Sequence, residues 1–297
     1  MNELRGIYTA VITPFQNDGS IDWAAFEVLV ERQIEAGIDG IVFLGTTGES
    51  PTLTHKEHEE VLKWGTEKVN GRCTVILSIG SNSTAESIDF AKIANQTKAD
   101  YVMAVNPYYN KPNQEGLYQH FCAIADVSEL PVMLYNIKGR SAVNIETDTL
   151  LRLAKHPNIK AVKEASGDLG QQIDVIRKVP ECFSVLIGDD PNVLPFMALG
   201  GDGLVSVTSN AIPKTLTKLV HTCLEDDYAV ARKKFFEIYE LMDSMMSVDV
   251  NPLGIKELMV QLGLTKPIFR LPMLRLSEEK QKEVAKWVEV VKEWEGK

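Results

Sequence analysis

The segment Ile159-Lys160-Ala161-Val162-Lys163-Glu164-Ala165-Ser166-Gly167-Asp168 contains the strand and the loop of one unit of the pattern that determines the fold. A short apolar strand of the kind that parallel sheets bury comes first and ends at Lys163. Small residues, a glycine and an aspartate follow, and a helical pattern then resumes. Because desolvating an ammonium is expensive, Lys163 either reaches water or gives up its proton and becomes a nucleophilic amine. This segment alone leaves both alternatives open.

The same order of strand, polar loop and helix recurs along the first three-quarters of the chain. The predicted strands are 7–13, 40–44, 74–79, 101–105, 131–135, 159–163, 184–187 and 203–207. Eight parallel strands joined by short loops and helices predict a (β/α)8 barrel, or TIM barrel. An open doubly wound sheet would usually show an early G-x-G-x-x-G, which is absent. A solenoid would repeat a shared motif, which these units lack.

Strand patterns stop after Glu225, and helical spacing continues to the end of the chain. We therefore predict a catalytic (β/α)8 barrel over residues 1–225 and a C-terminal appendage of three helices over residues 226–297. The methionines of the appendage are interpreted as flexible core residues rather than as ligands.

Composition excludes several classes of function. The chain has 297 residues, of which 44% are hydrophobic and 24% charged, as expected for a globular protein. The net charge of -10 argues against a nucleic-acid partner, and no apolar run approaches the roughly 20 residues that span a bilayer. No signal or transit peptide is visible at the N-terminus. The four cysteines are widely separated and are expected to be reduced thiols in a cytoplasmic protein.

In a barrel, the functional residues lie on the loops at the carboxyl ends of the strands. Those loops carry Thr46, Thr47, Tyr108, Tyr109, Tyr135, Arg140 and Lys163. Hydroxyls can relay protons and an arginine can hold a carboxylate, so this set fits an aldolase that acts on a small 2-oxo acid through an imine. We predict neither a metal nor another cofactor. Each residue also has a plain structural interpretation as a turn residue, a packed aromatic ring or a solvated charge.

Four segments together resemble the dihydrodipicolinate synthase family. They are Gly45-Thr46-Thr47-Gly48-Glu49-Ser50, Asn106-Pro107-Tyr108-Tyr109-Asn110-Lys111-Pro112, Tyr135-Asn136 with Arg140, and Lys163-Glu164-Ala165-Ser166-Gly167. The resemblance extends from about Gly6 to residues 270–272. It implies that pyruvate forms an imine with Lys163 and that the enamine attacks L-aspartate 4-semialdehyde, on the route to diaminopimelate and lysine.

The resemblance also implies roles for single residues. Thr47, Tyr135 and Tyr109 resemble the proton-relay hydroxyls, and Tyr109 would reach into the site of a neighbouring subunit. Thr46 and Thr47 would offer backbone N–H groups to the pyruvate carboxylate. Arg140 would hold the carboxylate of the semialdehyde, and the Val205 carbonyl would face pyruvate. We expect a homotetramer built from two tight dimers.

A second set of residues resembles the L-lysine site of the feedback-inhibited members. It consists of Ser50, Pro51, His55, His58, Asn82, Glu86 and Tyr108. Carboxylate and amide groups suit an ammonium, and a tyrosine suits a carboxylate. The simpler alternatives are that Glu86 only caps a helix and that the two histidines lie on a solvated first turn. We expect L-lysine to inhibit the enzyme.

The chain departs from the family pattern at two places. Lys138 replaces the proline of the usual Pro-Gly-Arg-Thr-Gly and adds a charge near the aldehyde pocket. Gly254 replaces a proline after Asn251, which should loosen that turn. A sister lyase, such as N-acetylneuraminate lyase or a 2-keto-3-deoxy sugar-acid aldolase, is therefore an alternative, although Arg140 argues against a sugar chain. An inert lysine-binding sensor is the other alternative, against which the intact set around Lys163 argues.

Overall fold

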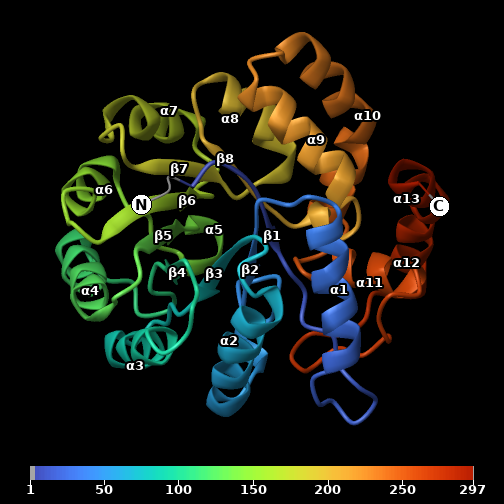
Figure 1. The fold of residues 1–297 in the computed structure, drawn as a ribbon, viewed down its shortest axis with the longest axis horizontal. Helices are drawn as coiled ribbons and strands as arrows, with labels where there is room; N and C mark the ends of the chain where they lie inside the picture. Colours follow the sequence, from blue (N-terminus) through green and yellow to red (C-terminus); the bar gives the residue numbers. More distant parts are fainter. Residues whose placement is uncertain (1–3, 297) are drawn as a thin grey trace.

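The computed structural model describes residues 4–296, which form a closed barrel of eight parallel strands in chain order (Figure 1). The strands are β1 (Gly6–Ala10), β2 (Gly40–Phe43), β3 (Thr74–Ser78), β4 (Tyr101–Val105), β5 (Val132–Asn136), β6 (Ile159–Glu164), β7 (Ser184–Ile187) and β8 (Gly203–Ser206). Each strand pairs with the next, and β8 pairs with β1. The predicted (β/α)8 barrel is confirmed.

The helices of this part of the chain surround the barrel, except the short α5, which lies inside the ring that the others form (Figure 1). They are α1 (Trp23–Glu35), α2 (His55–Val69), α3 (Thr84–Ala94), α4 (Gln114–Val127), α5 (Lys138–Ser141), α6 (Thr147–Leu153), α7 (Leu169–Lys178), α8 (Val193–Ala198) and α9 (Pro213–Leu224). Single 3₁₀ turns follow β2, β7 and β8 as η1 (Ser50–Thr52), η2 (Asp190–Asn192) and η3 (Thr208–Asn210). The short α5 lies where the sequence predicted a polar loop.

The start of α2 and the end of β1 show how side chains set the limits of the elements. Thr54 and Glu57 form the predicted capping box, each side chain binding the other residue's backbone N–H. The first strand ends at Ala10, earlier than the predicted limit at residue 13. Beyond this point the Asn210 side chain binds the backbone, because its Nδ2 donates to the Ala10 carbonyl and its Oδ1 accepts from the Ile12 N–H.

Side-chain alternation along the strands divides the apolar core into two parts. Tyr8, Met103, Tyr135 and Ala161 belong to a cluster inside the barrel, whereas a larger cluster packs between the strands and the helices. Lys163 lies two residues beyond Ala161 on β6 and therefore shares its inward face.

Within the described residues, four helices follow position 225. They are α10 (Tyr228–Ser247), α11 (Leu253–Gln261), α12 (Glu278–Ala285) and α13 (Val288–Glu295). The prediction of three helices is wrong because the last one is interrupted. The Trp287 N–H donates to the carbonyl of Val284, three residues back, and its indole N–H donates to Ser244 at 3.2 Å. That these helices form a separate unit from residue 226 stays a prediction.

Gly254 has a packing role that its sequence context did not reveal. A Cβ atom at this position would lie 2.7 Å from Val248 Cγ1 and 3.0 Å from the Met245 carbonyl oxygen. The residue is in the first turn of α11, and the absence of a side chain lets α11 approach the end of α10. Close packing, rather than a loosened turn, accounts for this glycine.

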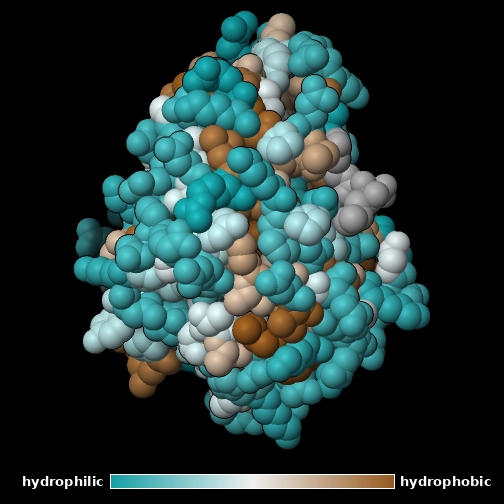
Figure 2. All heavy atoms as spheres, turned by 90° about the vertical axis from the view of Figure 1, so that its left-hand side faces the viewer, coloured by the Kyte–Doolittle hydropathy of each residue, from teal (hydrophilic) through white to brown (hydrophobic). Residues whose placement is uncertain are grey.

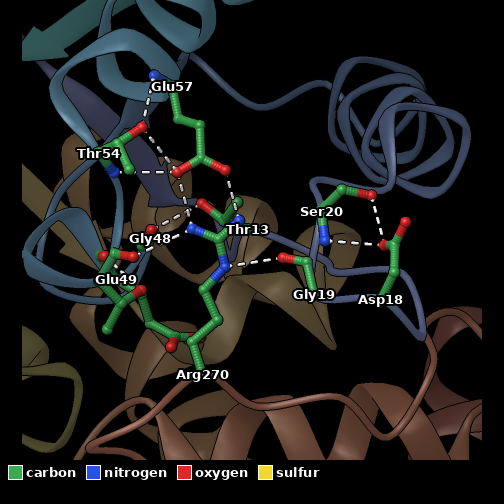
Figure 3. Close-up of polar contacts among 10 residues, drawn as sticks. Thr13, Asp18, Gly19, Ser20, Gly48, Glu49, Thr54, Glu57 and Arg270 are labelled. Carbon is green, nitrogen blue, oxygen red and sulfur yellow. Dashed lines mark hydrogen bonds and ion pairs between the residues drawn. The ribbon is translucent and has the colours of Figure 1, made fainter.

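Arg270 anchors the segment after α11 to the barrel loops (Figure 3). Its guanidinium donates to the carbonyls of Gly19 and Thr52 and to both carboxylate oxygens of Glu57, at 2.5 to 3.0 Å. It also lies 4.3 Å from the centroid of the Phe15 ring. The hydrogen bonds from Arg270 to the Glu57 carboxylate lower the pKa of Glu57 to about 2.

Hydrophilic residues cover most of the face shown in Figure 2, and apolar residues gather there in a few separate places. Across residues 4–296, no helix has both the length and the apolar character needed to span a membrane.

The cysteines at positions 73, 122, 182 and 223 are all free. The cytoplasmic location stays a prediction.

Candidate active site

A cavity of about 410 Å³ opens at the carboxyl ends of β2 to β5. Its wall comes from the ends of these strands, from the loops that follow them, and from α2, α3 and α5. The lining residues are Leu44, Gly45, Thr46, Ser50, Pro51, Leu53, His55, His58, Ser78, Gly80, Ser81, Glu86, Phe90, Val105, Tyr108, Tyr135, Ile137, Arg140 and Ser141. The cavity therefore lies at the end of the barrel where such folds carry their chemistry.

Lys163 is buried inside the barrel beside this cavity. Its side chain is only 4% exposed, and Nζ lies 4.2 Å from the centroid of the Tyr135 ring, which forms part of the cavity wall. The contact follows from the strand register, because Tyr135 on β5 is paired with Lys163 on β6. Lys163 is therefore not a solvated residue at a strand end.

Gly188, directly after β7, leaves the space that the Lys163 side chain occupies. A Cβ atom on Gly188 would lie 2.5 Å from Lys163 Cε and 3.2 Å from Lys163 Cγ. The same Cβ atom would also lie 3.1 Å from Ala165 Cβ. The glycine is thus required by the lysine beside it.

The two threonines after β2 face different surroundings. Thr46 lines the cavity. Thr47 is 2% exposed, and its Oγ1 accepts a hydrogen bond of 3.1 Å from Asn251 Nδ2. Thr46 is thus the one of the two that lies on the cavity wall, and the relay role of the Thr47 hydroxyl stays a prediction.

Arg140 and Val205 belong to different parts of the barrel. Arg140, on α5, lines the cavity, and its Nη2 donates to the backbone carbonyl of Asn251 at 2.8 Å. Val205, on β8, is buried in the cluster inside the barrel. Lys138 is exposed on the first turn of α5, two residues before Arg140.

The neighbouring tyrosines after β4 differ in position. Tyr108 lines the cavity, whereas Tyr109 is 88% exposed and lies outside the cavity lining. Tyr109 has a φ angle of 71°, a left-handed conformation that is uncommon for a residue other than glycine. The chain alone therefore does not bring Tyr109 to Lys163.

Most of the predicted lysine-site residues share the cavity with Thr46, Tyr135 and Arg140. Asn82 is outside the lining, and its backbone carbonyl accepts a hydrogen bond from Asn110 Nδ2 at 2.8 Å. Among residues 4–296, no group of three or more His, Cys, Asp and Glu side chains is arranged to hold a metal ion.

The Glu86 carboxylate lies in the part of the cavity that the predicted lysine-site residues line. One oxygen accepts a hydrogen bond from Ser81 Oγ, and the other lies 2.5 Å from His55 Nε2. The Glu86 carboxylate is therefore not used to cap α3, although its N–H bonds Ser83 Oγ at 3.4 Å.

The two histidines of α2 have different environments. His55 is exposed, whereas His58 is buried and stacks on Phe90 with ring centroids 3.9 Å apart. Burial lowers the pKa of His58 to about 4, so its ring is neutral at pH 7. His58 Nε2 lies 3.0 Å from the Ser78 carbonyl oxygen, which can only accept, so this nitrogen carries the proton.

Three contacts made by two residues of the C-terminal region were missed by the sequence reasoning. Asn251 bonds both Thr47 and Arg140, and Lys256 forms a fully buried ion pair with Glu49. The only signal in the sequence was indirect, namely the Asn-Pro step at residues 251 and 252 before a helix. Glu164 is another buried carboxylate without a predicted role, and it binds the Ser166 N–H at 2.7 Å directly after the lysine strand.

The fold and the site define a (β/α)8-barrel enzyme whose pocket, at the carboxyl ends of the strands, is built beside a buried lysine. Comparison with known proteins makes the assignment more specific. The model of the Dihydrodipicolinate synthetase family matches residues 3–291. The chain belongs to this family.

Similar proteins cover the whole chain. A 4-hydroxy-tetrahydrodipicolinate synthase from Koribacter versatilis is 48% identical over 96% of this chain and 95% of its own length. The dihydrodipicolinate synthase of Acinetobacter baumannii, crystallised with pyruvate, is 38% identical with a TM-score of 0.94, covering 97% of this chain and 98% of its own. The enzyme from Cyanidioschyzon merolae, crystallised with lysine bound, is 34% identical with a TM-score of 0.93, covering 99% and 100%.

Proposed function

We propose that this enzyme condenses pyruvate with L-aspartate 4-semialdehyde to give 4-hydroxy-tetrahydrodipicolinate, in the biosynthesis of diaminopimelate and lysine. The observation that carries the proposal is the buried Lys163 against Tyr135 in a chain of this family. The pyruvate complex of the A. baumannii relative supports the first substrate.

The chemistry begins with attack of the Lys163 amine on the C2 carbonyl of pyruvate. The carbinolamine loses water to give an imine, and loss of a C3 proton then gives the enamine that attacks the aldehyde carbon. Proton transfers at these steps need hydroxyl groups near the reacting atoms. Tyr135 and Thr47 supply them, as the resemblance to the family implies, and Tyr135 lies on the cavity wall. The backbone N–H groups of Thr46 and Thr47 bind the pyruvate carboxylate, and the Val205 carbonyl faces pyruvate.

Arg140 binds the carboxylate of the semialdehyde. Its position on the cavity wall and its planar guanidinium suit two parallel hydrogen bonds to a carboxylate. A polyhydroxyl chain would call instead for neutral donors and acceptors, which favours the semialdehyde over sugar-derived aldehydes.

Tyr109 completes the relay of a neighbouring subunit in a tight dimer, and two such dimers form a tetramer. The exposure of Tyr109 and of the apolar residues Leu271 and Leu274 supports an interface between copies of the chain.

L-lysine inhibits the enzyme by binding beside Glu86. The carboxylate suits the ammonium groups of the ligand, and Tyr108 suits its carboxylate. The lysine complex of the C. merolae relative supports this assignment. We expect millimolar L-lysine to lower activity and Glu86→Ala to remove the effect; undiminished wild-type activity at high lysine would contradict this part of the proposal.

Borohydride reduction in the presence of pyruvate tests the main proposal. Intact-protein mass spectrometry should find a pyruvate adduct on the wild type and on Lys160→Ala, a control on the same strand, but none on Lys163→Ala. Absence of an adduct from the wild type would favour an inert lysine sensor. An adduct without turnover of L-aspartate 4-semialdehyde would favour a sister aldolase, which a parallel assay with sugar-derived aldehydes would identify.

A further inference from the structure

We propose that Asn251 is a positioning residue that joins the two carboxylate-binding groups of the active site. Its side chain orients the hydroxyl of Thr47 toward pyruvate, and its backbone carbonyl holds Arg140. The inference rests on the proposed function and gives the C-terminal helices a part in substrate binding.

Asn251 reaches the barrel from the turn that leads into α11. Its side-chain Nδ2 donates to Thr47 Oγ1 at 3.1 Å, and its backbone oxygen accepts from Arg140 Nη2 at 2.8 Å. The residue is only 8% exposed. One buried residue thus contacts the groups assigned to pyruvate and to the semialdehyde.

The direction of the Asn251 hydrogen bond determines what the Thr47 hydroxyl can do. A hydroxyl that accepts from an amide N–H keeps its own proton free to donate to another group. An anionic pyruvate carboxylate needs donors, and hydrogen bonds to charged groups are stronger than those between neutral groups. Asn251 therefore prepares Thr47 as a donor before the substrate arrives.

Within the described residues, the side-chain amide of Asn251 makes one hydrogen bond, which is the one to Thr47. Among residues 4–296, Asn251 Oδ1 is buried and has no hydrogen-bond partner. Leaving a buried acceptor unsatisfied costs about 1–3 kcal/mol, so an apolar residue would serve stability better at this position. The hydrogen bond to Thr47 therefore accounts for an asparagine at this position.

Contacts made by the two residues after Thr47 hold its loop in place, and one of them joins the loop to α11. Lys256 pairs with Glu49 in the interior, and its Nζ lies 4.6 Å from the centroid of the Phe15 ring. Thr13 Oγ1 donates to the Gly48 carbonyl at 2.6 Å, as seen in Figure 3. The loop and the start of α11 therefore keep a fixed separation, which the hydrogen bond from Asn251 to Thr47 requires.

The two contacts of Asn251 can be separated, because only one uses the side chain. Asn251→Ala removes the bond to Thr47 and leaves the carbonyl that holds Arg140. We expect the KM for pyruvate to rise about tenfold, with less than a threefold change in the KM for the semialdehyde. Asn251→Asp should raise the KM for pyruvate further. Its carboxylate accepts a hydrogen bond from the Thr47 hydroxyl, which is then no longer free to donate to pyruvate, and it also repels the pyruvate carboxylate.

The experiment measures both KM values, kcat and the rate of pyruvate trapping by borohydride in the full chain. Gln261→Ala serves as the control, because Gln261 ends the helix that Asn251 precedes and bonds Glu257 and the Gln281 carbonyl, away from the cavity. In a Thr47→Val background, Asn251→Ala should have no further effect on the KM for pyruvate, a result that a general loss of stability would not produce.

The inference is overturned if folded Asn251→Ala keeps the wild-type KM for pyruvate, or if its effect persists without the Thr47 hydroxyl. If Asn251→Ala does not fold, the nearly isosteric Asn251→Asp decides, and a KM for pyruvate equal to that of the wild type refutes the role. Failure of the wild type to form a pyruvate adduct would instead refute the proposed function. The two failures are thus distinguishable.

Discussion

Replacement of Gly188 by alanine should disable imine formation by displacing Lys163. The new Cβ would lie 2.5 Å from Lys163 Cε, about 0.9 Å inside the shortest ordinary contact of 3.4 Å. The lysine side chain must retreat by roughly that amount, and its burial against Tyr135 limits where it can go. Overpacking of this kind typically costs about 1–3 kcal/mol, and a misplacement of about 1 Å can cost on the order of 100-fold in rate.

The assay follows the rate of borohydride-trapped pyruvate adduct on the wild type and on Gly188→Ala. We expect the variant to trap pyruvate on the order of 100-fold more slowly. Gly170→Ala, in α7, controls for the loss of backbone freedom that any change from glycine to alanine brings.

A double-mutant cycle separates the clash with Lys163 from other effects of the added methyl group. Urea unfolding should show that Gly188→Ala costs about 1–3 kcal/mol in the wild type and much less in Lys163→Ala, which lacks Cγ and Cε. The reasoning is refuted if Gly188→Ala traps pyruvate at the wild-type rate, or if it destabilises the protein equally with and without the lysine.

Three further predictions follow from other contacts. Lys256→Met should destabilise the protein by about 3–5 kcal/mol because it leaves the Glu49 carboxylate buried without its partner, and adding Glu49→Leu should recover most of the loss in urea unfolding; failure to recover would contradict this account. Glu57→Gln should cost about 1 kcal/mol after allowance for solvent screening, since the folded-state pKa of Glu57 is lowered to about 2. That stabilisation is complete above pH 4.5 and is lost as the pH falls toward 2, so unfolding free energies of variant and wild type should differ at pH 7 and converge near pH 2. Tyr109→Phe and Lys163→Ala should each be nearly inactive, yet mixed dimers of the two should regain activity if Tyr109 serves a neighbouring subunit; no gain on mixing would place its role elsewhere.

The barrel could be predicted from the sequence because its strands are buried on both faces. Each appears as a continuous apolar run followed by a polar loop, and most predicted limits lie within a residue of those observed. The first strand is the exception. Its end depends on the Asn210 side chain, 200 residues from Ala10, which no local pattern reveals.

The site was predictable to the extent that it lies on consecutive loops. Strand order brings Thr46, Tyr135, Arg140 and Lys163 to one end of the barrel, and the resemblance to a family named their roles. Which of two adjacent threonines faces the cavity depends on the direction of each side chain, which spacing does not encode. Asn251 was missed because it contacts Thr47 across 204 residues of sequence.

The buried pair of Glu49 and Lys256 has a consequence for protein engineering. A chimera that joins the barrel of one family member to the C-terminal helices of another would inherit the acid from one parent and the base from the other. Recombination at residue 225 succeeds only when both parents carry the same pair, so the two residues should be transferred together, as a single unit of exchange.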